Sequence, residues 1–226
     1  MRCSVCLVLA ACGFQSAPAP DAPTAIADAP STCRLAATGA VATGEIIGMG
    51  GGSMRDALAC DAPDQRIVGL QIEMSDGPAN GQSSRSARGI AIGCATVTVD
   101  TLGAHDGSVT MKQAEGNGGS HWSPSTWQPY TPCIAGAVVA GIGVHGGAQA
   151  NESNLMTDVS ISCASLDVTG ATTTVTNVPV AGTMPGTGMN PSSYQCPAGQ
   201  QITEIVPFTG AGLDRLQPSC AAIACD

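Results

Sequence analysis

One short pattern occurs three times in this sequence, and the repetition constrains the fold more than any other feature. Each copy opens with a cysteine followed by an aliphatic segment, and the opening residues are Cys60, Cys133 and Cys196. Each copy closes on an alternating apolar run that ends in Cys-Ala, and the closing residues are Cys94, Cys163 and Cys220. Three copies of one supersecondary unit predict a pseudo-threefold architecture.

The segments between the cysteines predict an all-β domain. Residues 67–74, 95–100 and 172–178 alternate between apolar and polar side chains and favour β-branched residues. The 29 Gly and 15 Pro residues interrupt the chain every few positions, so helices of more than two turns are not expected. With two Trp, two Tyr and two Phe, the core must be mainly aliphatic, and disulfides are expected to stabilise it. Residues 33–226 are enough for one domain with a sizeable core.

The N-terminus resembles a bacterial lipoprotein signal. A basic Met1-Arg2 head precedes an apolar stretch that ends in Leu9-Ala10-Ala11-Cys12, which resembles a lipobox. The resemblance implies that residues 1–11 form a signal peptide and that Cys12 is lipidated after cleavage. The apolar stretch is too short to cross a bilayer. Because Gly13 rather than Asp follows, the predicted location is the outer membrane of the cell envelope. The alternative is an ordinary signal peptide, or a fragment of one, and a secreted protein.

Residues 12–32 are predicted to form a tether. They are rich in Ala and Pro, and Asp-Ala-Pro recurs among them. Such a segment cannot bury enough apolar surface to offset the cost of ordering it. It is expected to be extended and semi-rigid. The tether would hold the folded domain, residues 33–226, away from the membrane.

The cysteine count supports an exported, disulfide-bonded domain. Of eleven cysteines, Cys3 and Cys6 belong to the signal and Cys12 carries the lipid, which leaves eight. An even number in an exported chain predicts four disulfides. The repeat frame predicts three bridges, each between the opening and closing cysteine of one copy: Cys60–Cys94, Cys133–Cys163 and Cys196–Cys220.

The two remaining cysteines predict how the chain closes. Cys33 and Cys225 both align with an aliphatic strand position of the repeat. They would meet if the first strand paired with the last and so closed a ring. The alternative, a metal site, lacks a close Cys-x-x-Cys pair and a neighbouring His. No metal and no cofactor is therefore expected.

The repeat resembles those of two known families. The order Cys, Pro or Ala, Gly, then Ile or Val, then Gly-Ile or Gly-Leu, closing on an alternating run and Cys, is similar to the repeat of vitelline membrane outer layer protein. It also resembles jacalin-like lectins, which share the β-prism fold, and the Gly-rich turns at 48–53 and 116–120 fit the same repeat. The resemblance covers residues 33–226 and implies a β-prism of three four-stranded Greek-key sheets. The residues alone leave a sandwich, barrel, prism or propeller open, and the threefold count favours the prism.

One loop of the last repeat is a candidate ligand site. The string Gly210-Ala-Gly212-Leu-Asp214 resembles the Gly-x-x-x-Asp loop with which jacalin-like lectins hold sugar hydroxyls. A carboxylate at a loop tip can accept two hydroxyl hydrogen bonds, while glycine lets a ligand approach the backbone closely. Gly210, Gly212 and Asp214 are therefore predicted ligand contacts. The alternative is that Asp214 caps a tight turn. A second Gly-x-x-x-Asp string, at 52–56, lies elsewhere in the repeat and is interpreted as coincidental.

Half of the aromatic residues fall in one insert of the second repeat, at Trp122, Trp127 and Tyr130. Exposed Trp and Tyr side chains stack on sugar faces or anchor protein partners, so these three are also predicted ligand contacts. The alternative is a long loop whose aromatic side chains cap an open end of the prism core. Long loops inside compact domains are often functional.

The excess of acidic residues and the surroundings of the histidines argue against several classes of function. Eight basic and seventeen acidic residues argue against nucleic-acid binding and against electrostatic attachment to anionic lipid. His105, His121 and His145 lie in Gly-rich surroundings without a nucleophile pattern, so no enzyme is predicted.

The predicted function is a cell-envelope lipoprotein that displays a lectin-like, carbohydrate-binding module. Its expected partners are a glycan or surface polysaccharide and, through the lipid, a membrane. One alternative is a non-catalytic structural envelope protein. A second is an oligosaccharide-modifying enzyme, because vitelline membrane outer layer protein has been linked to oligosaccharide transfer.

Overall fold

The computed structural model describes residues 32–76, 85–115, 124–146, 155–167, 169–183, 189–210 and 212–225. By its internal contacts the chain divides into Met1–Pro30 and Ser31–Asp226, and all described residues belong to the second unit. The predicted signal peptide, the lipidated Cys12 and nearly all of the tether lie outside them, as does Trp122. Within the described ranges every regular element is a strand.

The first nine strands are β1 (Thr32–Thr43), β2 (Ile47–Gly48), β3 (Ser53–Met54), β4 (Leu58–Ala59), β5 (Gln65–Ser75), β6 (Ala87–Asp100), β7 (Gly103–Asp106), β8 (Thr110–Glu115) and β9 (Ser125–Trp127). The remaining strands are β10 (Thr131–Pro132), β11 (Val138–Gly146), β12 (Met156–Leu166), β13 (Thr172–Pro179), β14 (Met189–Gln195), β15 (Gln200–Thr209) and β16 (Leu213–Cys225). The alternating segments predicted as strands lie in β5, β6 and β13, as expected.

Each repeat forms its own antiparallel group of strands. The group of the second repeat is a separate four-stranded sheet, whereas β1 pairs with both β6 and β16 and so joins the first and third groups in one 12-stranded sheet. In the second repeat the order is β13-β12-β11-β14, in which three consecutive strands are followed by a fourth that returns beside the first. This is a Greek key. In the first repeat β8 pairs with β6, β6 with β5, and β5 with both β9 and β10. We call the groups of the first, second and third repeats sheets C, D and B.

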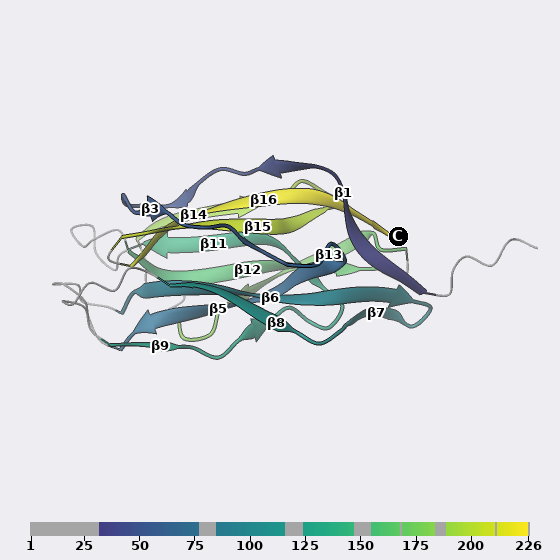
Figure 1. The fold of residues 1–226 in the computed structure, drawn as a ribbon, viewed down its shortest axis with the longest axis horizontal. Coiled ribbons are helices and arrows are strands. Elements are labelled where there is room, and N and C mark those ends of the chain that lie inside the picture. Colours follow the sequence, from purple (N-terminus) through teal and green to yellow (C-terminus); the bar gives the residue numbers. More distant parts are fainter. Residues whose placement is uncertain are drawn as a thin grey trace, which may run out of the picture. The chain divides into compact units, whose positions relative to one another are not determined.

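Sheet B is completed by the start of the chain. The C-terminal hairpin β15–β16 receives β1 and β2 along β16, and β3 and β4 along β15. Figure 1 shows β1 beside β16 near the C-terminus. The predicted pairing of first and last strands is therefore confirmed. The domain is an all-β β-prism in which the chain ends close the third sheet.

All four predicted disulfides are present. Cys60–Cys94, Cys133–Cys163 and Cys196–Cys220 each staple one repeat. Cys33–Cys225 joins β1 to β16, with a Cα–Cα distance of 5.3 Å across a sequence separation of 192 residues. A link between the two chain ends constrains the unfolded state more than any bridge within a repeat.

The same β-bulge marks the central hairpin of every sheet. In sheet C the register shifts between Ile67 and Gly69, and in sheet D between Val139 and Gly141. In sheet B the shift falls between Ile202 and Glu204. The bulges fix residue equivalence between the repeats, because an extra residue at one place re-aims every following side chain.

The core is aliphatic, as predicted. A large buried cluster draws on all three sheets, and its fully buried members include Ile72, Ile90, Ile142, Ile161 and Ile202. Side chains from three sheets that meet in one cluster explain why a single repeat would not fold alone. No helix long and apolar enough to span a membrane occurs among the described residues.

Candidate functional site

Asp214 lies where two loops meet. It follows the turn that joins β15 to β16, and its side chain is 7% exposed. Short strand β3 pairs with the end of β15, so that Ser53 lies opposite Thr209. This pairing brings the Gly-rich segment 48–52 beside the Asp214 turn.

Three glycines surround the Asp214 carboxylate. A Cβ atom at Gly50 would lie 3.1 Å from Oδ1, and one at Gly210 would lie 3.0 Å from Oδ2. A Cβ at Gly52 would overlap Oδ2 and would lie 2.7 Å from the carbonyl carbon of Thr209. Only glycine fits at Gly52, because backbone atoms cannot move aside as a flexible side chain does. We call Asp214 with Gly50, Gly52 and Gly210 the Asp214 cradle.

Backbone N–H groups act on the carboxylate in the cradle. Those of Gly210 and Gly52 both lower the pKa of Asp214. Gly210 N also lies 3.0 Å from the carbonyl oxygen of Gly212, which closes a tight turn. Asp214 therefore caps this turn and also ties it to the N-terminal glycine loop.

Burial dominates the electrostatics of the cradle. Desolvation raises the pKa of the Asp214 carboxyl above its ordinary value, while the Gly210 N–H, the Arg215 guanidinium and the Gly52 N–H act in the opposite direction. The Arg215 guanidinium carbon lies 4.8 Å from the centre of the Phe208 ring, so this charge is held against an aromatic face.

The third repeat is the only one with an acid at this position. Six residues before the closing cysteine, Asp214 corresponds to Arg88 in the first repeat and Thr157 in the second, and all three are buried. The predicted contact Gly212 is buried as well, since a Cβ there would lie 2.8 Å from the Ala87 carbonyl oxygen. The cradle is thus a local specialisation of one hairpin end.

The described aromatic side chains of the insert pack on sheet C. A Cβ at Gly69 would lie 2.5 Å from the Tyr130 hydroxyl, and one at Gly93 would lie 2.6 Å from its ring. Burial, and then Asp106, raise the pKa of Tyr130 to about 12. Trp127 pairs with Glu73 at the edge of β5, and its ring lies close to Gly89. Tyr130 and Trp127 thus pack on sheet C, whereas Asp214 belongs to sheet B.

Two of the three histidines lie beside aspartates. His145 Nδ1 lies 2.9 Å from Asp158 Oδ2, and His105 Nε2 lies 3.4 Å from Asp100 Oδ1. His121 lies outside the described residues. Within the described ranges, no group of three His, Cys, Asp or Glu side chains could hold a metal ion.

Sequence reasoning identified Asp214 and Gly210 but did not connect them to Gly50 and Gly52. The Gly-rich run at 48–53 was recognised as a turn of the repeat, and this was the available signal. The sequence does not reveal that β3 pairs with β15 over two residues. This pairing places the run against the carboxylate.

No protein-family model matches the chain, and no curated protein matches it. Solved structures that resemble it include Calsepa lectin in complex with a biantennary N-glycan, at 12% identity, with 82% of this chain and 99% of that chain covered and a TM-score of 0.49. They include Malaysian banana lectin, at 14% identity, 81% and 99% coverage and a TM-score of 0.46. A mannose-specific jacalin-related lectin from Morus nigra matches at 13% identity, 81% and 96% coverage and a TM-score of 0.44.

Proposed function

We propose that the chain is a non-catalytic carbohydrate-binding module and that it engages a sugar at the Asp214 cradle. The observation that carries the proposal is a carboxylate enclosed by glycines from two loops that are far apart in the sequence. A turn cap requires only its own loop. A carboxylate shared by two glycine-rich loops is suited to a ligand that contacts both.

The chemistry of the cradle matches sugar hydroxyls. An ionised carboxylate has about four acceptor positions, and the N–H groups of Gly210 and Gly52, which lower its pKa, face two of them at most. The remaining positions can accept hydrogen bonds from two ligand hydroxyls, which are strengthened by the negative charge. Gly50 and Gly51 are exposed, so their backbone groups are available to the same ligand.

The cradle suits a sugar better than a cation. Two of the carboxylate's neighbours are N–H donors, and Arg215 adds a positive charge nearby. Hard cations prefer several oxygen ligands, which these neighbours do not supply. The contacts of Trp122, Trp127 and Tyr130 with a ligand stay predictions, as does the role of Gly212.

The proposal extends to the setting of the module. We infer an envelope lipoprotein, attached through Cys12 and carried on the Ala- and Pro-rich tether of residues 12–32. The support is the lipobox-like string and the four disulfides of the folded domain, which suit an oxidising compartment. A surface-displayed module would meet glycans or polysaccharides outside the cell.

A glycan array tests the proposal. The chain should bind a subset of glycans, and Asp214→Asn should abolish that binding because it removes the charge and one acceptor oxygen. Asp56→Asn is the matched control, since Asp56 ends the other Gly-x-x-x-Asp string and is exposed. Absence of any bound glycan would leave a structural envelope protein as the better account. Turnover of chito-oligosaccharides would instead indicate an enzyme.

A further inference from the structure

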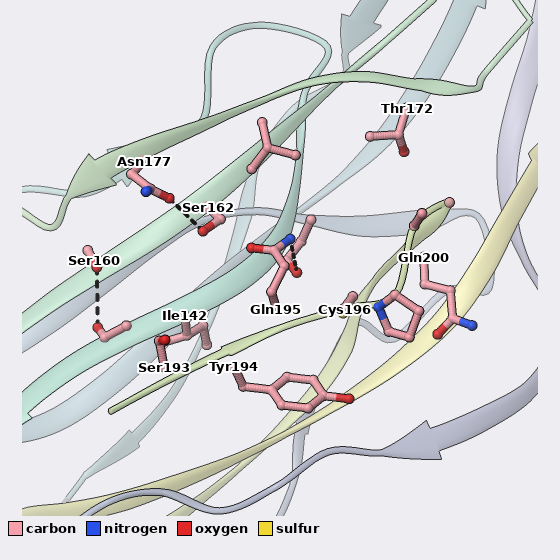
Figure 2. Close-up of a pocket in the computed structure, with 16 residues that line it drawn as sticks. Ile142, Ser160, Ser162, Thr172, Asn177, Ser193, Tyr194, Gln195, Cys196 and Gln200 are labelled. Carbon is pink, nitrogen blue, oxygen red and sulfur yellow. Dashed lines mark hydrogen bonds between the residues drawn. The ribbon is translucent and has the colours of Figure 1, made fainter. Parts of the chain in front are cut away.

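We propose a second binding site, for an extended and uncharged oligosaccharide chain, in a trough on the outer face of sheet D. The trough is a cavity of about 590 Å³. Side chains that line it and carry the argument are Ser162, Thr172, Asn177, Ser193, Gln195 and Gln200. Figure 2 shows them projecting from neighbouring strands of sheet D and from the start of β15. The inference stands on these residues and not on the Asp214 cradle.

The trough is uncharged, and its lining combines polar with apolar side chains. Among the described residues that line it, none is Asp, Glu, Lys, Arg or His, although the chain as a whole carries a net charge of −9. Hydroxyl and carboxamide groups both donate and accept hydrogen bonds. A charged ligand would find no counter-charge there, so the fitting ligand is neutral and rich in hydroxyl groups.

Internal hydrogen bonds fix several of these side chains (Figure 2). Ser162 Oγ lies 2.7 Å from Asn177 Oδ1, and Gln195 Nε2 donates to the Ala140 carbonyl oxygen at 2.9 Å. Side chains held in place lose less conformational entropy when a ligand binds. The wall of the trough is thus organised before any ligand arrives.

Two polar atoms of the lining have no hydrogen-bond partner among the described residues. They are Thr172 Oγ1 and Gln200 Oε1, and both are buried. A buried polar atom without a partner is costly, and rotation of either side chain toward the trough would let a ligand supply the missing partner. A ligand hydroxyl can donate to Gln200 Oε1 and can donate to or accept from Thr172.

A comparison between repeats shows that an aromatic ring covers a position in sheet C which the smaller carboxamide of Gln195 covers in sheet D, over Gly141 and beside the trough. In sheet C the Tyr130 ring lies over Gly69 and Gly93, which pair with each other after the bulge. In sheet D the same register pairs Gly141 with Ser162.

The residue that covers the position in sheet C has a small counterpart in sheet D. Tyr130 and Ser193 each stand three residues before the opening cysteine of the next repeat. Those cysteines occupy matching places, since Cys133 N–H donates to Val68 and Cys196 N–H donates to the bulge residue Ala140. Sheet C therefore has the aromatic side chain of Tyr130 at this position, and sheet D has the smaller side chain of Ser193.

The site continues beyond the trough. A second cavity of about 270 Å³ shares Gly143, Ser160 and Ser193 with it and reaches His145 and Pro191. Two cavities joined through three shared residues accommodate a chain of linked sugars better than a single one. The glycine and serine of the floor let the ligand approach the sheet, and Val175 offers an apolar contact to sugar C–H groups.

Affinity electrophoresis of the full chain in gels that contain neutral polysaccharides tests the proposal. The probes are a β-glucan, an α-mannan and a dextran, with an alginate gel as the anionic comparison. At least one neutral polysaccharide should retard the chain, and alginate should not. The variant Ser162→Gly with Ser193→Tyr copies the arrangement of sheet C and should abolish the retardation.

A second variant keeps the test valid if the first variant does not fold. Asn177→Ala with Gln195→Ala removes two polar side chains without adding bulk and should weaken binding about tenfold or more. Thr176→Ala is the control, because Thr176 is exposed on the same strand but does not line the trough. It should be retarded like the wild type.

Asp214→Asn separates this site from the cradle and should leave the retardation unchanged, whatever happens to binding on the array. The proposal is overturned if no neutral polysaccharide retards the chain, or if both trough variants are retarded as strongly as the wild type. Loss of the retardation in Asp214→Asn alone would place the polysaccharide site at the cradle instead.

Discussion

The carboxylate of Asp214 lies directly against Gly52, where an added Cβ would overlap Oδ2, so the last hairpin of the chain packs on a loop that precedes the first repeat. This contact depends on the closure of sheet B by the N-terminal strands. The candidate site is therefore a product of ring closure, and not of any one repeat. The close packing at Gly52 and the burial of Asp214 can each be tested.

Replacing Gly52 with alanine should both destabilise the domain and weaken glycan binding. The new Cβ would overlap Asp214 Oδ2 and press on the Thr209 backbone. Overpacking of this kind costs about 1–3 kcal/mol. Urea unfolding and the glycan array measure the two effects. Gly51→Ala is the matched control, because a Cβ at Gly51 meets nothing within 4 Å. Equal stability of the two variants would contradict the cradle geometry.

The stability of the domain should depend on pH through Asp214 in a definite direction. Burial raises the pKa of this carboxyl in the folded state above its ordinary value of 3.8. At a pH well below 3.8 the group is protonated in both states and contributes nothing. As the pH rises through the unfolded and then the folded pKa, the unfolded state ionises first and stability is lost.

Asp214→Asn cannot ionise, so it should become more stable relative to the wild type as the pH rises from about 3 to about 6. Chemical unfolding of both proteins across this range measures the difference. The comparison with the wild type cancels the carboxylates whose pKa is lowered in the folded state, such as Asp167. A difference that stayed constant, or changed with the opposite sign, would show that burial does not dominate at Asp214.

Removal of the terminal bridge should lower stability without abolishing the fold. Cys33→Ala with Cys225→Ala opens a loop of 192 residues, which the chain-entropy model values at roughly 5 kcal/mol as an upper figure. The three repeat disulfides stay in place, so a cooperative thermal transition should remain at a lower midpoint. An unchanged midpoint would mean that the strand pairing of β1 and β16 makes the bridge redundant.

The lipobox-like string predicts how the chain is anchored. Cys12→Ser should prevent lipidation and leave the N-terminus unprocessed or release the protein from the membrane fraction. Detergent-phase partitioning of the expressed wild type and variant measures this. If the variant distributed into the detergent phase as the wild type does, the protein would be a plain exported one.

Much of the fold was predictable because the spacing of the cysteines shows which strand positions correspond between the repeats. The spacing of Cys33 and Cys225 against the repeat frame implied that the first and last strands pair, and Leu35 does pair with Cys225. The alternating runs implied the central strands for the same reason, since a period of two is visible in sequence. Long-range strand order followed from the repeat.

The candidate sites were less predictable because they depend on contacts without a sequence pattern. Gly52 meets Asp214 only through β3, a strand of two residues that no periodicity can reveal. The aromatic residue Tyr130 looked like an exposed ligand contact, yet its ring covers two glycines whose missing side chains provide the space. The trough on sheet D becomes visible only when the bulges have fixed which residues correspond.

Amide chemical shifts measured during titration with an array-positive glycan would locate the carbohydrate site. The largest shifts should fall on the cradle amides of Gly50, Gly52, Gly210 and Asp214, and Asp214→Asn should remove them. Shifts that avoided these amides, or that persisted unchanged in Asp214→Asn, would contradict the assignment of the Asp214 cradle as a carbohydrate site.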